Sequence, residues 1–174
     1  VSFHQGLPLY SDQASIYNSI YYTKYHLFTE NVIGALKFYG ANVIAIDDDV
    51  RLSKRLHIPS RRLRGFESHK VGPKDGIDYV GGNYATALNF EAALPNLLPE
   101  STQTDIAIFM DAGNLWGVDY DSSVNDSNGI RSSVGINSNI YTPIGPLSFV
   151  YALPITKEST DTTQTFLFQI GTSF

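Results

Sequence analysis

TDIAIFMDAGNLW, residues 104–116, alternates between apolar and small or polar side chains over almost its whole length. One set of alternate positions holds Ile106, Ile108, Met110 and Ala112, and the other mainly Asp105, Ala107, Asp111 and Gly113. Because the side chains of a strand point alternately to its two faces, this segment predicts a strand with one apolar and one polar face.

The same alternation recurs in YATALNFEAAL (84–94) and in TFLFQIGTSF (165–174). Around a closed barrel, such strands put lipid outside and a polar lumen inside. The chain contains no run of 18 apolar residues, so no transmembrane helix is predicted.

The composition narrows the possible classes of protein. Eleven Tyr and ten Phe against one Met fit the aromatic girdles of a membrane barrel, although a soluble sandwich also accommodates them. The absence of Cys excludes disulfides and thiolate metal sites. A net charge of −5 argues against a nucleic-acid partner.

We predict about eight strands, over residues 1–8, 15–29, 32–46, 81–94, 104–117, 130–142, 147–155 and 164–174. Their connections alternate in length. The turns at 29–31 and 143–146 are tight, whereas 47–80 and 118–129 are long and polar. Outer-membrane barrels have this asymmetry, with short periplasmic turns and longer external loops, and it assigns the turn at 95–103 to the periplasmic side.

Segment 47–80 holds eight of the twelve Lys and Arg residues. An eight-stranded barrel is filled by its own side chains, so a loop of this kind stays outside it or belongs to a larger barrel. In the second case the strand near Val1 and the strand 164–174 are edges that need partners, because unpaired backbone groups are costly in lipid. The chain begins at Val1 without an initiator Met or a signal sequence, so we interpret it as a fragment or mature piece that does not fold alone.

Five blocks of sequence carry a family resemblance: LRGF (63–66), GGNYATALNFEAALPN (81–96), FMDAGNLWG (109–117), YTPIGPLSFVYALPI (141–155) and FQIGTSF (168–174). Together they resemble the C-terminal half of the transmembrane barrel of the BamA outer-membrane protein assembly factors, in the bacterial surface antigen superfamily. The resemblance implies an all-β antiparallel transmembrane barrel of 16 strands. Residues 1–174 are then the C-terminal part of one barrel domain, and an N-terminal half barrel and periplasmic POTRA domains lie outside this chain.

The resemblance also implies a loop anchor. In that family the long loop folds back into the lumen, and its arginine pairs with acidic residues of the wall. Matching block by block gives Arg64, Glu91 and Asp111, with Gly65 permitting a turn and Phe66 wedging the loop against the wall. The alternation independently assigns both carboxylates to the polar face, and a guanidinium fork suits two carboxylates.

Two points leave the loop anchor open. The first is the alternative that Arg64 is a solvated loop charge and that the two carboxylates merely line a wet lumen. The loop also departs from many relatives, which carry an aromatic residue and two glycines where this chain has Pro59 and Ser60.

The last strand resembles the C-terminal assembly signal of outer-membrane barrels, through Phe166, Phe168, Ile170 and Phe174. In the family this strand also meets the first barrel strand at a weak seam that opens sideways. Gly171, taken as lying inside the strand, would loosen it. The alternative is that residues 164–174 simply close the barrel.

Sites for other chemistry are not predicted. His4, His26, His57 and His69 have no ligand spacing and are interpreted as surface or loop residues. Asp119, Asp121 and Ser123 resemble the start of a calcium loop, but Val124 and Ile130 stand where Gly and Glu are needed. We therefore predict no metal, no cofactor and no enzyme activity.

The resemblance implies a protein that folds and inserts other barrels into the bacterial outer membrane. Its partners are unfolded outer-membrane proteins, membrane lipid and accessory lipoproteins. A transporter of the same superfamily that secretes an unfolded partner is the first alternative. A passive diffusion pore and a soluble β-sandwich are the others.

Overall fold

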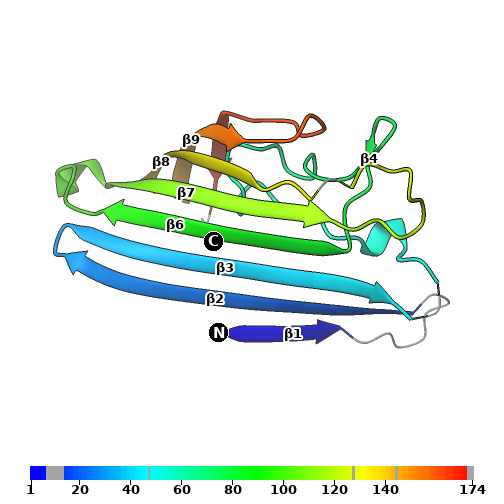
Figure 1. Ribbon diagram of the computed structural model, residues 1–174. Coiled ribbons are helices and arrows are strands. Elements are labelled where there is room, and N and C mark those ends of the chain that lie inside the picture. Colours follow the sequence, from blue (N-terminus) through cyan, green and yellow to red (C-terminus); the bar gives the residue numbers. More distant parts are fainter. Residues whose placement is uncertain (7–13, 47, 127, 144, 172–174) are drawn as a thin grey trace.

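Eight antiparallel strands form one sheet in which each strand pairs with its neighbour along the chain (Figure 1). The computed structural model describes residues 1–6, 14–46, 48–126, 128–143 and 145–171. In sheet order the strands are β1 (Ser2–Gly6), β2 (Ser15–Thr29), β3 (Val32–Ala45), β6 (Tyr84–Leu94), β7 (Thr104–Trp116), β8 (Arg131–Thr142), β9 (Gly145–Thr156) and β10 (Phe166–Ile170). The predicted all-β antiparallel fold is confirmed.

The elements outside this sheet are short. β4 (Lys74–Asp75) and β5 (Asp78–Tyr79) form a small hairpin within the predicted loop, and η1 (Leu52–Lys54) and η2 (Glu100–Thr102) are single 3-10 turns. Among the described residues, no helix has the length and apolar character needed to cross a membrane.

Strand boundaries differ from the prediction where the chain finds another backbone partner. The strand expected from residue 81 begins at Tyr84, because Gly82 pairs with Leu56 of the loop instead (Leu56 N donates to Gly82 O at 2.8 Å). The strand expected over 147–155 runs from Gly145 to Thr156. Residues 7 and 8 of the first predicted strand lie outside the described residues.

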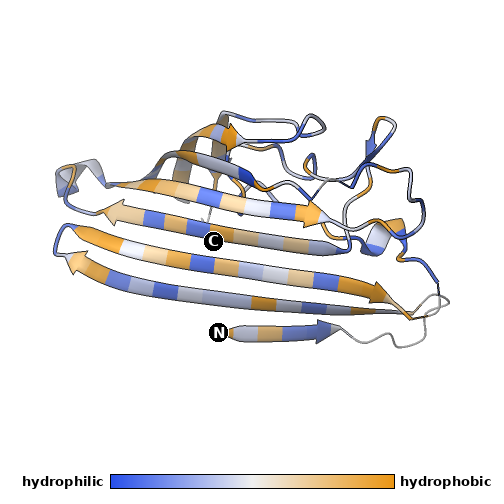
Figure 2. Ribbon diagram, viewed as in Figure 1, coloured by the Kyte–Doolittle hydropathy of each residue, from blue (hydrophilic) through white to orange (hydrophobic). Residues whose placement is uncertain are grey.

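The two faces of the sheet differ in polarity, as the banding along its strands in Figure 2 illustrates. Large apolar side chains on the outward face are exposed, among them Ile20, Phe38, Phe90, Ile108, Met110, Ile136, Tyr151, Leu153 and Phe168. Small or polar residues are buried on the inward face, among them Ser19, Ala85, Ala87, Asn89, Asp111, Ser133, Ser148 and Ala152. An apolar face this extensive is what a strand wall presents to lipid, whereas a soluble sandwich packs its apolar face inside.

The sheet curves, and the segment between β3 and β6, here called the long loop (residues 48–83), lies against its concave side (Figure 1). Leu63, Phe66 and Val71 of the loop form one buried cluster with Ala85 and Val43 of the wall. The short connections lie together at the other end, where Asn96 Nδ2 donates to Asn31 Oδ1 at 2.6 Å. β1 and β10 are the two edges of this open sheet.

Candidate functional site

Arg64 binds two carboxylates of the inward face. Its Nε and Nη2 donate to Asp111 Oδ2 and Oδ1, both at 2.7 Å, and its Nη1 donates to Glu91 Oε2 at 2.7 Å. The guanidinium also lies 3.5 Å from the ring centroid of Phe109. The three residues that the family resemblance brought together are therefore in contact.

The register of the wall explains why one arginine reaches both acids. Glu91 on β6 pairs with Phe109 on β7, and Asp111 lies two residues further along β7, on the same face. The two carboxylates are therefore diagonal neighbours across adjacent strands, with the Phe109 ring between them. A planar guanidinium stacked on that ring meets one acid at each edge.

The acids also change the acid–base behaviour of Arg64. Burial by itself lowers the pKa of the guanidinium, but the hydrogen bonds and charge of Asp111, and then of Glu91, raise that pKa above its ordinary value. The Asp111 side chain is fully buried, so its contacts with Arg64 replace hydrogen bonds that water would otherwise make.

The backbone around Arg64 is bonded to three different parts of the wall. Arg64 N donates to Asp111 Oδ2 at 3.0 Å, and the Ser133 hydroxyl donates to Arg64 O. Asn89 Nδ2 donates to Arg62 O at 2.9 Å. The side chains of β6, β7 and β8 therefore fix the main chain of the loop as well as its charge.

Gly65 and Phe66 both lie close against the wall. Gly65 has a φ of +93°, and a Cβ there would lie 3.2 Å from Ser133 Cβ and 3.3 Å from Ala152 Cβ. Both the left-handed backbone and the close approach to the wall favour glycine. Phe66 is 1% exposed and packs in the cluster beneath the loop.

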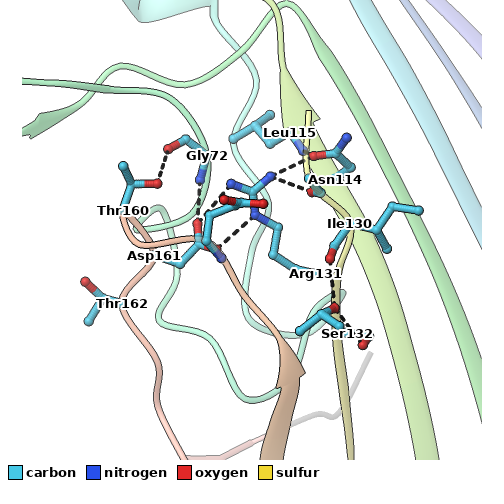
Figure 3. Close-up of polar contacts among 12 residues, drawn as sticks. Gly72, Asn114, Leu115, Ile130, Arg131, Ser132, Thr160, Asp161 and Thr162 are labelled. Atoms are coloured by element: carbon cyan, nitrogen blue, oxygen red, sulfur yellow. Dashed lines mark hydrogen bonds and ion pairs between the residues drawn. The ribbon is translucent and has the colours of Figure 1, made fainter. Parts of the chain in front are cut away.

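A second buried ion pair, absent from the sequence analysis, joins β8 to the β9–β10 connection (Figure 3). Arg131 Nε donates to Asp161 Oδ2 at 2.9 Å, and Arg131 Nη1 donates to Asn114 Oδ1 at 2.7 Å. Asp161 Oδ1 also accepts the N–H of Gly72 in the long loop at 3.1 Å. Both charged side chains are 0% exposed.

A third cluster holds the start of the long loop. Asp119, considered above only as part of a rejected calcium loop, forms an ion pair with Arg55 and accepts from Val50 N at 3.0 Å and from Asn83 Nδ2 at 2.8 Å. Burial tends to raise the pKa of Asp119, but these bonds, that of Val50 first, lower it below its ordinary value. The carboxylate therefore fastens both ends of the loop to the connection after β7.

Sequence signals for these two further clusters are weak. Arg131 lies two residues before Ser133 on β8, so both side chains point to the inward face. A charged residue at such a position could have indicated a buried ion pair. Asp161 and Asp119 lie in irregular segments, where no periodicity assigns a side chain to a face.

The last strand differs from its prediction in both of its ends. Expected over 164–174, β10 begins at Phe166, because Gln164 N donates to Gly65 O of the long loop at 2.9 Å. Gly171 directly follows β10 with a φ of +114°, so its placement inside the extended strand was wrong.

The aromatic positions of this strand lie partly within the described chain. Phe166, Phe168 and Ile170 are exposed at alternate positions of β10. Phe174 lies outside the described residues.

The histidines do not form a ligand set. His57 and His69 come within 5.2 Å, centroid to centroid, inside the long loop. Burial lowers the pKa of His57, and the charge of His69 lowers it further. Across the described ranges, no group of three or more His, Asp or Glu side chains has a metal-binding arrangement.

Comparison with known proteins places this architecture in a family. The model of the Omp85 superfamily domain matches residues 2–174. The outer membrane protein assembly factor BamA of Neisseria meningitidis serogroup B is 30% identical over 64% of this chain and 17% of its own length. BamA of Neorickettsia risticii is 33% identical over 64% of this chain and 16% of its own length.

A solved structure agrees with these relatives. The crystal structure of BamA from Haemophilus ducreyi lacking POTRA domains 1–3 superposes with a TM-score of 0.72 at 25% identity, covering 90% of this chain and 34% of that one. The present chain thus spans less than a fifth of the BamA sequences above. Because the family model covers nearly every residue, the chain belongs to the Omp85 superfamily.

Proposed function

We propose that the full-length protein containing this chain folds and inserts β-barrel proteins into the bacterial outer membrane. Its BamA relatives are outer membrane protein assembly factors by name. In this proposal the chain supplies the C-terminal part of one barrel, and an N-terminal half barrel and periplasmic POTRA domains complete the protein. Its partners are unfolded outer-membrane proteins, the surrounding lipid and accessory lipoproteins of an assembly complex.

The observation that carries this proposal is the short pairing of the last strand with the wall. Within the described residues, the strand partners of β10 run from Phe166↔Tyr151 to Ile170↔Leu147, although β9 extends to Thr156. A short edge strand has few ladder bonds to lose, and its free edge offers backbone groups to another strand. We infer that the seam beside β10 opens and templates an incoming strand by β-augmentation.

The long loop supports this role because it holds the chain just before β10. Phe66 forms a β-bridge with Thr163, Glu67 N donates to Thr162 O at 3.0 Å, and Thr162 N donates to Lys70 O at 2.9 Å. The position of the last strand is thereby tied to the loop that Arg64 fastens to the wall. In the proposal, Arg64, Gly65, Phe66, Glu91 and Asp111 keep the seam in a competent shape.

The energy for insertion comes from the substrate in this mechanism. A barrel that enters the membrane satisfies its backbone groups and transfers its apolar outer face from water to lipid. No cofactor and no covalent step are required, so the protein acts as a template rather than as an enzyme.

The test follows the folding rate of an unfolded test barrel in liposomes that contain the full-length protein. Wild type should accelerate folding strongly, and Arg64→Ala should lose most of that acceleration. Arg61→Ala is the matched control, because Arg61 is an exposed arginine of the same loop. Arg64→Lys keeps the charge but not the planar fork, so it should retain only part of the activity.

Two results would overturn the proposal. Open-pore conductance without any acceleration by wild type would indicate secretion or diffusion instead. Equal loss of activity in the Arg61 and Arg64 variants would show that the anchor has no specific part in assembly.

A further inference from the structure

A groove crosses the outward face of the sheet near the short turns. It has a volume of about 670 Å³ and is lined by Phe28, Gly34, Phe90, Ala92, Ile108 and Met110, together with Lys24 and His26. The register resolves these residues into two adjacent rows across β2, β3, β6 and β7. One row is Lys24–Leu36–Phe90–Met110, and the other is His26–Gly34–Ala92–Ile108.

Small residues form the floor of this groove. Gly34 on β3 and Ala92 on β6 are paired neighbours, and both line the groove. The Phe28 ring lies over Gly34, since a Cβ on that glycine would be 2.4 Å from Phe28 Cε2, so the open part of the floor is at Ala92. The result is an apolar channel that runs across three strands from a cationic end on β2.

Lys24 is the unusual member of this face. It points to the side where exposed apolar residues predominate, and the ion pairs found in the described part of the chain do not include it. No outward position of β2, β3, β6 or β7, strands that the structure describes in full, carries Asp or Glu. A lysine on the lipid face is costly at the bilayer centre and tolerated near the headgroups.

The depth of Lys24 brings a headgroup within its reach. β2 ends at Thr29, five residues beyond Lys24, which is about 16 Å along a strand and about 12 Å of height at the tilt of a membrane barrel. A lysine side chain extends toward the interface from such a depth. His26, one step nearer the turn on the same face, lies between Lys24 and the headgroup level.

We propose that this groove is a phospholipid site, in which Lys24 and His26 bind the phosphate and an acyl chain passes the Phe28 ring and lies over Ala92 toward Ile108 and Met110. The paired rows match an amphiphile, because Lys24 and His26 lie on β2 and the outward side chains of the other strands in these rows are apolar. Glu91 also lines the groove, but its carboxylate binds Arg64 on the inward face. The site would hold a lipid of the leaflet on the short-turn side. It requires that the wall spans a membrane, but it does not depend on assembly activity.

The test is native mass spectrometry of the full-length protein. The protein is mixed with phosphatidylglycerol in detergent, and the lipid that stays bound after release from the detergent is measured. Wild type should retain this lipid, and Lys24→Gln should weaken retention by about tenfold, the value of one charge-assisted hydrogen bond. Lys37→Gln is the matched control, because Lys37 pairs with Thr23 and Asn89 on the inward face. Lys24→Arg should retain the lipid, which shows that the site itself is intact.

A second variant tests the acyl part. Ala92→Leu fills the floor of the groove, leaves Lys24 and His26 unchanged, and should also reduce retention. Inorganic phosphate should not displace the lipid, because most of the contact is apolar. Equal retention by wild type and Lys24→Gln, equal loss in the Lys24 and Lys37 variants, or displacement by phosphate alone would each overturn the proposal.

Discussion

Replacing Asp161 by Ala should destabilise the protein more than any surface charge substitution in this chain. Both partners of the Arg131–Asp161 pair are 0% exposed, so the variant removes a carboxylate that binds a buried guanidinium. Removing one member of a buried ion pair costs about 3–5 kcal/mol. The variant leaves the hydrogen bonds from Arg131 to two neutral acceptors in place, Asn114 Oδ1 at 2.7 Å and Gly129 O at 2.8 Å.

The structural reason is that Asp161 joins three segments. Besides Arg131, its carboxylate accepts the N–H of Gly72 in the long loop and the N–H of Glu158 at 2.7 Å. Losing it should free the segment before β10 as well as the loop. Asp161→Asn keeps an acceptor oxygen for Gly72, so its cost should be smaller.

The assay combines denaturant unfolding of the full-length protein in detergent with hydrogen exchange. Exchange should accelerate at the amides of Gly72 and Gln164, while the centre of β6 stays protected. The double variant Arg131→Met with Asp161→Leu should recover part of the stability, because it removes both charges of the pair, but Gly72 N and Glu158 N still lose their acceptor. A loss below about 1 kcal/mol for Asp161→Ala, with unchanged exchange at Gly72, would refute the reasoning.

Two further predictions concern the long loop. Gly65→Ala should lower the free energy of unfolding by about 1–3 kcal/mol, because alanine at a φ of +93° is strained and its Cβ meets those of Ser133 and Ala152. Hydrogen exchange in the loop should accelerate and the rate of barrel assembly should fall. An unchanged rate of hydrogen exchange would contradict this prediction. Lowering the pH through 6.5 should loosen the same loop, because the folded state lowers the pKa of His57 and the unfolded chain therefore takes up the proton first. The stabilisation is complete above pH 6.5 and declines below it. As the pH is lowered from 8 to 5, the protection of loop amides from hydrogen exchange should therefore fall in wild type but stay constant in His57→Gln. Parallel pH profiles of the two proteins would exclude His57 as the cause.

Most of the fold could be predicted from the alternation of apolar and polar side chains along the sequence. In segments such as 104–116, the period of two specifies strand, face and polarity together, and the structure confirms the strand Thr104–Trp116. Strand ends were less accurate where another part of the chain competes for backbone bonds. Gln164 illustrates this, because the loop carbonyl of Gly65 binds it ahead of β10.

The contacts around Arg64 were predicted from the family resemblance, which matches Arg64, Glu91 and Asp111 block by block. The alternation by itself placed only the two acids, on the inward face. The Arg55–Asp119 and Arg131–Asp161 pairs had no such match, since their partners lie 64 and 30 residues apart and the acids fall in irregular segments.

Local periodicity thus determined that this chain forms strands with a lipid face and a polar face, because the alternation of side chains is a property of each strand by itself. Which charges meet across the inward face depended on the register of the sheet and on the path of residues 48–83 over its concave side. Ion pairs between distant segments form only after folding has brought the segments together and removed water from around them, so only the tertiary structure defines them.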